Sequence, residues 1–510
     1  MRYFEVASKL LTQEPNKEIP GYGLGLRHVQ IILQFFLVTV FVAMNMTLPI
    51  TIVAMANPIN SEHMGVTVSA NWTDQSLILV SVQYGYAVTQ LFGSVLCGAY
   101  GCRFVMPYSM FLSALVCVVI PVVTSNFGPH GLMICLIIQG ASQGFSLPVV
   151  PIYLDKWVPS SERNSIGTLM YAANALGAVI ATKGAALLSS SFLGWSSPYY
   201  VLGILGFFWT YFMLQFGRNV PEGCEEISAA EREYIKREKP VKDKVPWGRV
   251  LTTPALLAIW TAHAGTFWVM WLMTAEIPTY LFKVLKFSLN TDGDIVSDAY
   301  LMSWLFSFIM SGTTGYLIRS KILTVTVTRK ISQSIASYLV AICLILLGFL
   351  TDRDWVIFCL TTIFVGLTAS FWGFMLNYND ITHNRGIVTE IGGFIGTLTT
   401  LIPAISKNFI VTNQSDRAQW ALMFWITAAV AIVTNTVFFF YSSGDIQEWD
   451  SCSSGENGEL GISSQKGESR YLMGKSVPNT RDYASKGESV NNEDSSSNET
   501  KEINASRRNS

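Results

Sequence analysis

The sequence predicts an all-α membrane protein with twelve transmembrane helices in two bundles of six. Half of its 510 residues are hydrophobic and only 14% are charged, whereas soluble domains average about 25% charged residues. The charges concentrate in the first 27 residues, in 217–253, in short loops and after residue 441. The apolar runs between them have roughly the 20 residues that a helix needs to cross a bilayer. This composition excludes an ordinary soluble globular protein.

The apolar runs divide the chain into two similar halves. In the first half we expect spans at 29–56, 76–98, 104–125, 131–154, 165–188 and 198–216, and in the second at 254–282, 300–318, 331–350, 355–378, 387–411 and 420–441. The resulting domains are an N-terminal segment 1–28, bundles at 29–216 and 254–441, a central loop 217–253 that contains a helix-prone stretch, and a tail 442–510.

Basic residues predict the orientation, because cytoplasmic loops carry an excess of Lys and Arg. With a cytoplasmic N-terminus, twenty basic residues fall in inside segments and five, including Lys407, in outside loops. Both termini are then cytoplasmic. Asn71, in the sequon Asn71-Trp72-Thr73, lies in the first outside loop and is a predicted glycosylation site.

Other features limit the function. The tail is rich in Ser, Asn, Glu and Gly, so we expect it to be disordered. The sequence has no P-loop, HExxH or paired CxxC motif, which favours a transporter over an enzyme and predicts no metal and no cofactor. The net charge of −1 implies no nucleic-acid partner. The expected surroundings are the lipid bilayer, and no obligate protein partner is indicated.

Five stretches resemble one family of membrane transporters. They are "YGYAVTQLFGSVLCGAYGCR" (84–103), "GASQGFSLPVVPIYLDKWVPSSER" (140–163), "IPTYLFKVLKFSL" (277–289), "NYNDITHNRGIVTEIGG" (377–393) and "GDIQEWD" (444–450). They are similar to motifs of the anion:cation symporters, which include sialin, the vesicular glutamate transporters and sodium–phosphate cotransporters. The layout of six plus six spans is likewise that of the major facilitator superfamily, whose substrate site lies between two bundles that rock.

The resemblance implies alternating-access transport of a small anion coupled to Na⁺ or H⁺, in a plasma, endolysosomal or vesicular membrane. The chain departs from the family at charged positions. Arginines of family members fall on Met44, Leu136 and Thr266, and two glutamates linked to proton coupling fall on Gln139 and Gln143. Gln hydrogen-bonds in both directions but releases no proton.

Polar groups inside the spans are the candidates for the substrate and coupling pathway. Each has an alternative. Gln139 and Gln143 line the pathway or join helices by hydrogen bonds. Lys183 binds the anion or snorkels to the surface. His263 titrates in coupling or makes a structural bond. Glu276 replaces the missing acids, pairs with Lys183 or faces outside water.

Further residues are predicted from their helices and motifs. Gly140, Gly144 and Pro148 predict close helix contact and a kink. Glu390 is interpreted as a helix-capping acid in the first turn of span eleven. The other pathway candidates are Asn45, Tyr84, Tyr86 and Asn377, and the aromatic residues Trp268, Trp271 and Tyr378 are expected to face the cavity.

Charges in the inside loops form a predicted cytoplasmic gate. Its members are Arg103, Asp155, Glu162 and Arg163 in the first half, and Asp380 paired with Arg385 in the second. The intact loops favour a secondary transporter of phosphate, a sugar acid or an acidic amino acid. The lost charges favour the alternative, which is a relative with an uncharged substrate or a sensor or scaffold that does not transport.

Overall fold

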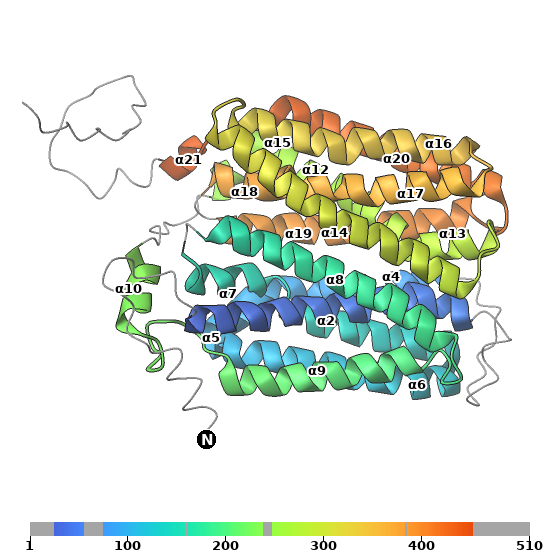
Figure 1. The fold of residues 1–510 in the computed structure, drawn as a ribbon, viewed down its shortest axis with the longest axis horizontal. Coiled ribbons are helices and arrows are strands. Elements are labelled where there is room, and N and C mark those ends of the chain that lie inside the picture. The colour runs from blue at the N-terminus through green and yellow to red at the C-terminus, as the bar shows by residue number, and fades with distance from the viewer. Residues whose placement is uncertain (1–24, 56–74, 160–161, 238–246, 383–384, 452–510) are drawn as a thin grey trace, which may run out of the picture. The chain divides into compact units, whose positions relative to one another are not determined.

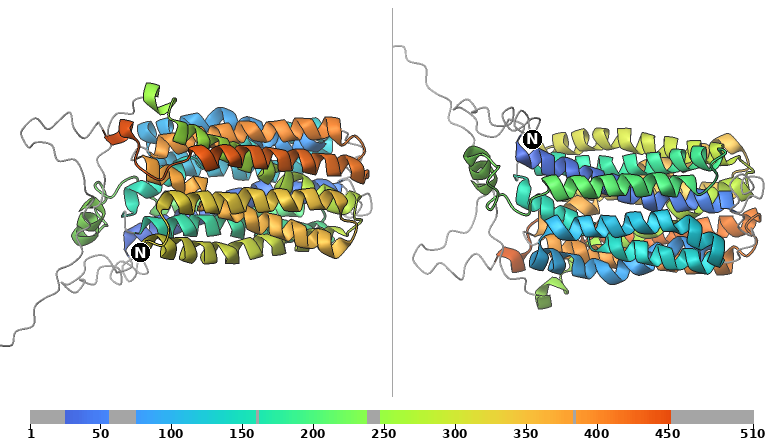
Figure 2. Two further views of the ribbon diagram at one scale, coloured as in Figure 1. Left: turned by 90° about the horizontal axis from the view of Figure 1, so that it is seen from above. Right: turned by 90° about the horizontal axis from the view of Figure 1, so that it is seen from below.

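The computed structural model describes residues 25–55, 75–159, 162–237, 247–382 and 385–451. Asn71 lies outside these residues, as does most of the tail. The described residues fold into long helices that run side by side in two halves (Figures 1 and 2). The helices of one half are drawn from blue to green in Figure 1, and those of the other from green to red.

The N-terminal half makes six passages. They are α2 (Leu26–Met55); α4 (Gln75–Thr89) with η2 (Gln90–Phe92) and α5 (Gly93–Tyr100); the two arms of α6 (Cys102–Gly144), the second continued by α7 (Val149–Trp157); α8 (Arg163–Ser189); and α9 (Ser197–Phe216). Gly128 divides α6, since its φ of 62° is a left-handed conformation that glycine adopts readily. The central loop forms α10 (Ala229–Arg237) and α11 (Trp247–Val250).

The C-terminal half makes six more. They are α12 (Pro254–Trp271) with the π-turn η3 (Leu272–Glu276) and α13 (Ile277–Lys283); α14 (Leu289–Arg319); α15 (Val325–Ser334) with η4 (Ile335–Leu339) and α16 (Val340–Phe349); α17 (Arg353–Thr368) with η5 (Ala369–Phe371) and α18 (Phe374–Ile381); α19 (Arg385–Ile410); and α20 (Arg417–Tyr441).

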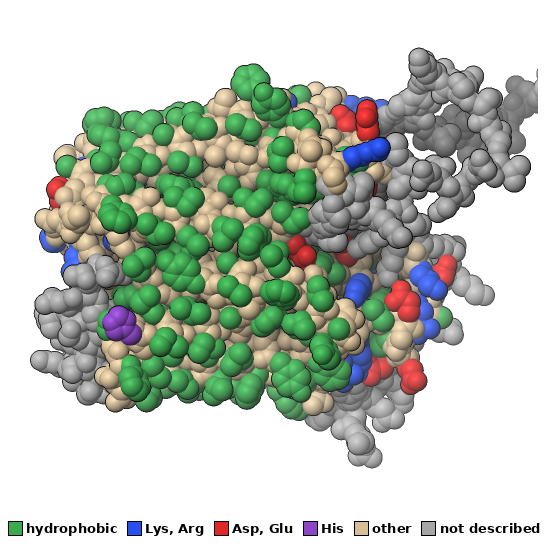
Figure 3. All heavy atoms as spheres, turned by 180° about the vertical axis from the view of Figure 1, so that it is seen from behind, with side chains coloured by type: hydrophobic (Ala, Val, Ile, Leu, Met, Phe, Trp, Pro, Cys, Tyr) green, Lys and Arg blue, Asp and Glu red, His purple; other side chains and the backbone are tan. Residues whose placement is uncertain are grey.

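The twelve predicted spans all correspond to a passage. Ten continuous runs in the described residues are long and apolar enough to cross a membrane. The run Cys102–Trp157 holds two passages, and the passage through α4 and α5 is interrupted by η2. Hydrophobic side chains cover the middle of the face shown in Figure 3, while charged side chains gather toward its ends.

Two predicted boundaries differ most from the structure. The span predicted at 300–318 begins eleven residues earlier, at Leu289, because the Ser288 hydroxyl accepts a hydrogen bond from the Thr291 amide and caps the helix. The tail is ordered at its start, where α21 (Glu448–Ser451) places Trp449 in a buried cluster. Gly444 also donates its amide hydrogen to the Thr326 hydroxyl.

Small residues set the closest helix contacts, as predicted. A Cβ atom at Gly140 would overlap the Val82 carbonyl of α4, and one at Gly144 would overlap the Thr89 hydroxyl. The helix is interrupted at 145–148 and resumes after Pro148 as α7. The two halves meet mainly along α8 with α14 and α4 with α19.

We call the end that carries the start of α2, α10 and α21 the inner end, and the opposite end the outer end (Figures 1 and 2). The inner end is the one that the basic loops predict to face the cytoplasm.

Candidate functional site

A cavity of about 370 Å³ lies between the two halves. The N-terminal half contributes Tyr86, Gln90 and Asp155, and the C-terminal half contributes His263 and Glu390. None of the described residues that line it is Lys or Arg. The site therefore combines two carboxyl groups and an imidazole with amide and phenol groups, and the described part of its wall carries no fixed positive charge.

The cavity reaches the inner end and is closed toward the outer end. Its lining includes Asp155 and Val158 at the end of α7, Ile166 at the start of α8 and Asn379 near the end of α18. At the outer end the halves are in contact, since Gln414 donates to the Gln75 side chain at 3.2 Å. The cavity is thus open at the inner end and closed at the outer end.

His263 makes the structural hydrogen bond that was one of the two predictions for it. Its Nδ1 lies 3.0 Å from the Tyr378 hydroxyl, which is a structural hydrogen bond, and the imidazole also lines the cavity. Its Nε2 has no hydrogen-bond partner among the described residues although the side chain is buried. The protein thus positions one ring nitrogen and leaves the other, enclosed beside the cavity, without a described hydrogen-bond partner.

Glu390 is not a capping residue. Since α19 begins at Arg385, Glu390 lies in the second turn, and its side chain lines the cavity. The Ser94 hydroxyl of α5 donates to its Oε2 at 3.3 Å, so this carboxyl links the two halves. Its Oε1 accepts no hydrogen bond from a described residue. The sequence prediction failed here because the inner end of α19 was placed two residues too late.

Two further residues connect the halves at the cavity. Gln90 accepts a hydrogen bond from the Thr397 hydroxyl at 3.4 Å, and Tyr86 lines the wall beside it. Tyr84 points elsewhere and packs partly buried against the N-terminal core. Of the two tyrosines in the YGY motif, only Tyr86 is at the cavity.

Gln139 and Gln143 do not line this cavity. Both are buried inside the N-terminal half, where the Asn45 amide donates to Gln143 Oε1 at 2.7 Å and joins α2 to α6. This bond supports the packing interpretation. Asn45 Oδ1 and the amide nitrogens of both glutamines have no hydrogen-bond partner among the described residues. The cluster therefore contains one acceptor and two donor groups whose hydrogen bonds are not satisfied by described residues.

Lys183 and Asn377 also lie away from the cavity wall. Lys183 Nζ is 3.3 Å from Asp294 Oδ1, and both side chains are about half exposed. Lys183 therefore does not supply the cavity with a cation and does not pair with Glu276. Asn377 is fully buried in α18.

Of the aromatic candidates, Trp268 donates to the Thr427 hydroxyl and Trp271 packs in the N-terminal core cluster, so neither lines the cavity.

Glu276 pairs with Lys407 instead. Lys407 Nζ lies 3.3 Å from Glu276 Oε2, and both side chains are almost completely buried. The sequence placed Lys407 in an outside loop, but it is part of α19. A lysine within three residues of a helix end gives no sequence signal that distinguishes a surface position from an inward one.

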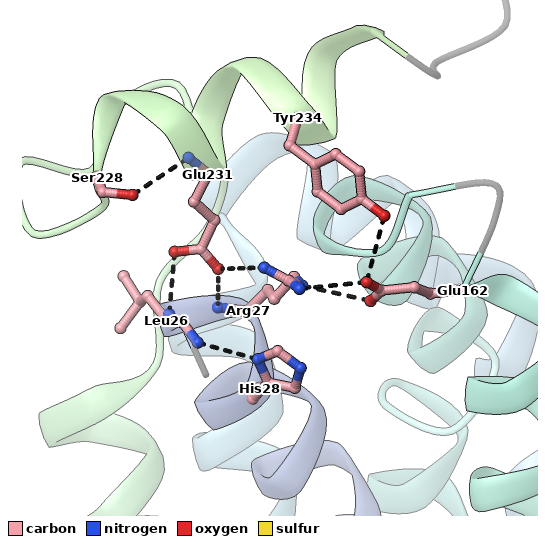
Figure 4. Close-up of polar contacts among 8 residues, drawn as sticks. Leu26, Arg27, His28, Glu162, Ser228, Glu231 and Tyr234 are labelled. Carbon is pink, nitrogen blue, oxygen red and sulfur yellow. Dashed lines mark hydrogen bonds and ion pairs between the residues drawn. The ribbon is translucent and has the colours of Figure 1, made fainter. Parts of the chain in front are cut away.

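The predicted inner gate is partly a set of contacts within the N-terminal half (Figure 4). Arg27, at the start of α2, pairs with Glu162 at 3.2 Å and with Glu231 of α10 at 3.3 Å. Glu231 also accepts the backbone hydrogens of Leu26 and Arg27, which have no partner within the helix. Arg27 and Glu231 were not predicted, because their roles depend on contacts between distant segments.

The remaining gate residues have other partners. Arg103 donates to the Leu214 carbonyl at 3.2 Å and thereby ties α6 to the end of α9. Asp380 pairs with Arg329 of α15 at 2.7 Å, and its predicted pairing with Arg385 stays a prediction. The side chains of Arg163 and Arg385 lie outside the described residues. Each described ion pair at the inner end thus joins elements of one half.

The three positions where the family carries arginine are occupied by groups that make local contacts. Met44 is buried against Gly206 of α9, and Leu136 lies in the N-terminal core. Thr266 accepts a hydrogen bond from Gln333 at 3.3 Å. None of these side chains lines the cavity.

A second hollow of about 700 Å³ is not a comparable site. It is lined by α5 and α6 of one half, and among its lining residues are the exposed Tyr100 and Tyr108. Its wall is almost entirely apolar and has no titratable acid or base besides tyrosine. Such a surface suits lipid chains.

Comparisons with known proteins agree with this geometry. The family model for the Major Facilitator Superfamily matches residues 35–406. The chain is 31% identical to a Drosophila melanogaster protein described as "Putative inorganic phosphate cotransporter", over 74% of this chain and 73% of that protein. It is 26% identical to human sialin, over 86% and 94% of the two chains.

The solved structures show the same fold. The xylose transporter XylE from E. coli, in an inward open conformation, matches with a TM-score of 0.61. The match covers 81% of this chain and 96% of XylE at 14% sequence identity.

Proposed function

Because the chain belongs to the anion:cation symporter family of the major facilitator superfamily, we propose that it is a secondary transporter that moves a small anion together with a proton. The chain is a multi-pass membrane transporter and not an enzyme. The small anion as substrate and the proton as coupling ion are the proposed parts of this function.

The observation that carries the proposal is the acidic cavity between the halves. Glu390 and Asp155 lie in its wall, and no lining residue among those described is Lys or Arg. A cavity shared by both bundles is where transporters of this superfamily bind their substrates. An inward-open cavity with an ionised Glu390 in its wall suits release of an anion, since the carboxylate repels it.

The same charges provide a reason for proton coupling. An anion beside an ionised Glu390 is repelled, and the repulsion is stronger in a cavity of low dielectric than in water. A proton on the carboxyl removes that repulsion, so the anion and the proton favour each other's binding. Ser94 links Glu390 to the opposite half, which lets its protonation influence how the halves contact each other.

His263 is the proposed polar contact for the solute. Tyr378 holds Nδ1, and the buried Nε2 has no partner among the described residues. A buried polar atom without a partner costs about 1–3 kcal/mol, so a solute oxygen that bonds to it gains that amount. The similarity to a protein described as a putative inorganic phosphate cotransporter and to sialin supports an anionic substrate.

Uptake into proteoliposomes tests the proposal. Labelled phosphate, sialic acid, glutamate and urate are each offered with a pH gradient or a Na⁺ gradient imposed separately. We expect saturable uptake of at least one anion driven by the pH gradient. Glu390→Gln should abolish accumulation but keep exchange of substrate across the membrane, and Glu226→Gln, a change at an exposed ion pair, serves as the control.

Two results would contradict the proposal. Accumulation driven by Na⁺ alone would make Na⁺ the coupling ion. Uptake of no anion by folded, inserted protein would refute anion transport.

A second candidate is transport of an uncharged polar solute. It is favoured by the absence of Lys and Arg from the described wall of the cavity. The same assay separates the two candidates if neutral sugars and neutral amino acids are included, because only this second candidate predicts that they accumulate while the anions do not.

A further inference from the structure

A lysine and a glutamate lie buried together in the outer half of the C-terminal bundle. Lys407 Nζ is 3.3 Å from Glu276 Oε2, and the side chains are 2% and 0% exposed. Neither residue lines the inward-open cavity. Charges at such depth in a membrane protein are costly and are kept mainly where they serve binding or conduction.

Lys407 points into the protein, against the usual behaviour of lysine near a membrane surface. Side chains on a helix tilt toward its N-terminus, and α19 runs from the inner end to the outer end. Lys407, three residues before the end of α19, therefore extends back toward the membrane interior. Its Nζ also lies 5.7 Å from the centre of the Trp420 ring. A lysine at this position that merely snorkelled would reach outward into water.

The carboxylate of this pair is incompletely hydrogen-bonded. Neither oxygen of Glu276 accepts a hydrogen bond from a described residue, so the ammonium group is its one described polar partner. Buried ion pairs offset their desolvation only when further hydrogen bonds complete them. Glu276 ends the π-turn η3, directly before α13. An anion with more acceptor oxygens could replace this carboxylate on Lys407.

The pair lies behind the surface where the two halves meet at the outer end. Ala275, next to Glu276, and Ala404, one turn before Lys407, pack into the core cluster of the N-terminal half together with Trp271 and Leu289. Separating the halves at the outer end would uncover this surface. The pair would then lie directly behind the small side chains Ala275 and Ala404 that line the space through which a solute enters.

We propose that Lys407 is the cation that binds the transported anion when the outer end is open, and that Glu276 occupies the anion's place when it is closed. This inference rests on the proposed function. It supplies the positive charge that the chain lacks at Met44, Leu136 and Thr266. It also explains transport from the outer end to the inner end, because the anion would bind at a lysine near the outer end and be released from a cavity that contains carboxyl groups.

Two other groups belong to the surroundings of the pair, and one of them, Arg417, enters the test. Tyr280 of α13 contacts the Trp420 ring at 5.4 Å between centroids. Arg417 begins α20, one turn before Trp420. Arg417→Gln therefore asks whether the anion uses the neighbouring guanidinium instead.

Binding to the purified full-length protein tests the inference without requiring transport. Thermal stabilisation is titrated with phosphate, sialic acid, glutamate and urate at constant ionic strength, since a ligand that binds the folded state raises its melting temperature. For the anion that stabilises the wild type, Glu276→Gln should lower the half-saturating concentration at least tenfold. Lys407→Gln should raise it at least tenfold, and Lys407→Arg should restore it in part.

Controls keep the result interpretable. The double variant Glu276→Gln with Lys407→Gln has no buried unpaired charge and should fold, yet it should not bind the anion. Lys283→Gln removes a half-buried lysine from the same end of the same half and should change nothing.

Each outcome has a defined meaning. If the double variant binds the anion as the wild type does, or if Arg417→Gln alone abolishes binding, this inference is wrong while the proposed function stands. If Glu276→Gln weakens binding, Glu276 is not the competitor. If no anion stabilises the wild type and none is taken up, the proposed function fails together with this inference.

Discussion

Glu231 should control how firmly the central loop holds the start of α2. We consider its replacement by alanine. Three hydrogen bonds would be lost, from the backbone nitrogens of Leu26 and Arg27 at 3.1 and 3.0 Å and from Arg27 Nη1 at 3.3 Å. The side chain of Arg27 would keep its bonds to Glu162.

The magnitude follows from these contacts. Loss of the acceptor for first-turn backbone hydrogens costs about 1 kcal/mol, as for an N-cap. Loss of a charged hydrogen bond to the buried guanidinium costs about 2 kcal/mol. The total of about 3 kcal/mol corresponds to about a 150-fold change in the local opening equilibrium, since 1.36 kcal/mol is tenfold.

Hydrogen–deuterium exchange measures that opening directly. In Glu231→Ala, peptides that cover the first turn of α2 and helix α10 should exchange about two orders of magnitude faster. Peptides from the middle of α2 should be unchanged. Glu231→Gln keeps one acceptor oxygen and should lie between the two, and Glu233→Ala, on the exposed side of the same helix, is the matched control.

The reasoning would be refuted by exchange within threefold of the wild type at the start of α2 in Glu231→Ala. An equal acceleration in Glu233→Ala would also refute it, because that result would reflect general loosening of α10 rather than loss of the Arg27 contacts.

Three other predictions concern packing and the cavity. Gly140→Ala should destabilise the protein by about 1–3 kcal/mol, because the added methyl group overlaps the Val82 carbonyl. Gly98→Ala, at a position where a Cβ atom would meet nothing within 4 Å, should not lower the melting temperature in detergent. Equal melting temperatures for the two variants would contradict the packing argument. Tyr378→Phe should raise the KM of the transported solute about tenfold, because His263 loses the group that orients it; an unchanged KM would show that the imidazole does not bind the solute. Trp449→Ala should lower the free energy of unfolding by about 3 kcal/mol, whereas Trp355→Ala, at an exposed position, should lower it much less. Similar melting temperatures for the two variants would show that α21 does not stabilise the fold.

The sequence predicts the spans well because hydrophobic length alone determines whether a helix can cross a bilayer. The stripe of Gly140 and Gly144 was also readable, since small residues at helical spacing permit close contact. Capping was less visible. Ser288 extends α14 into a stretch whose Asp292 and Asp294 resemble a loop, and only the hydrogen bond of its hydroxyl shows the true start.

The candidate site was predicted less completely, because its residues are joined by partners that lie far apart in the sequence. His263 was found from its polarity inside an apolar helix and Tyr86 from the YGY motif, and both line the cavity. Glu390 was placed on the right helix but given the wrong role. Lys407 was missed, because a charge near a helix end is ordinarily a surface charge and only its neighbours show that it is buried.

The contacts made after α20 fix the point from which the remainder of the chain continues. Gln447 donates its amide hydrogen to the Ile381 carbonyl at the end of α18, and Trp449 is buried beside it. The described chain therefore ends beside α18, several residues of which line the cavity, and not at the end of α20. Shortening the chain to Ser451 should keep this anchor, whereas a cut before Gly444 would remove it and uncover apolar surface on α18.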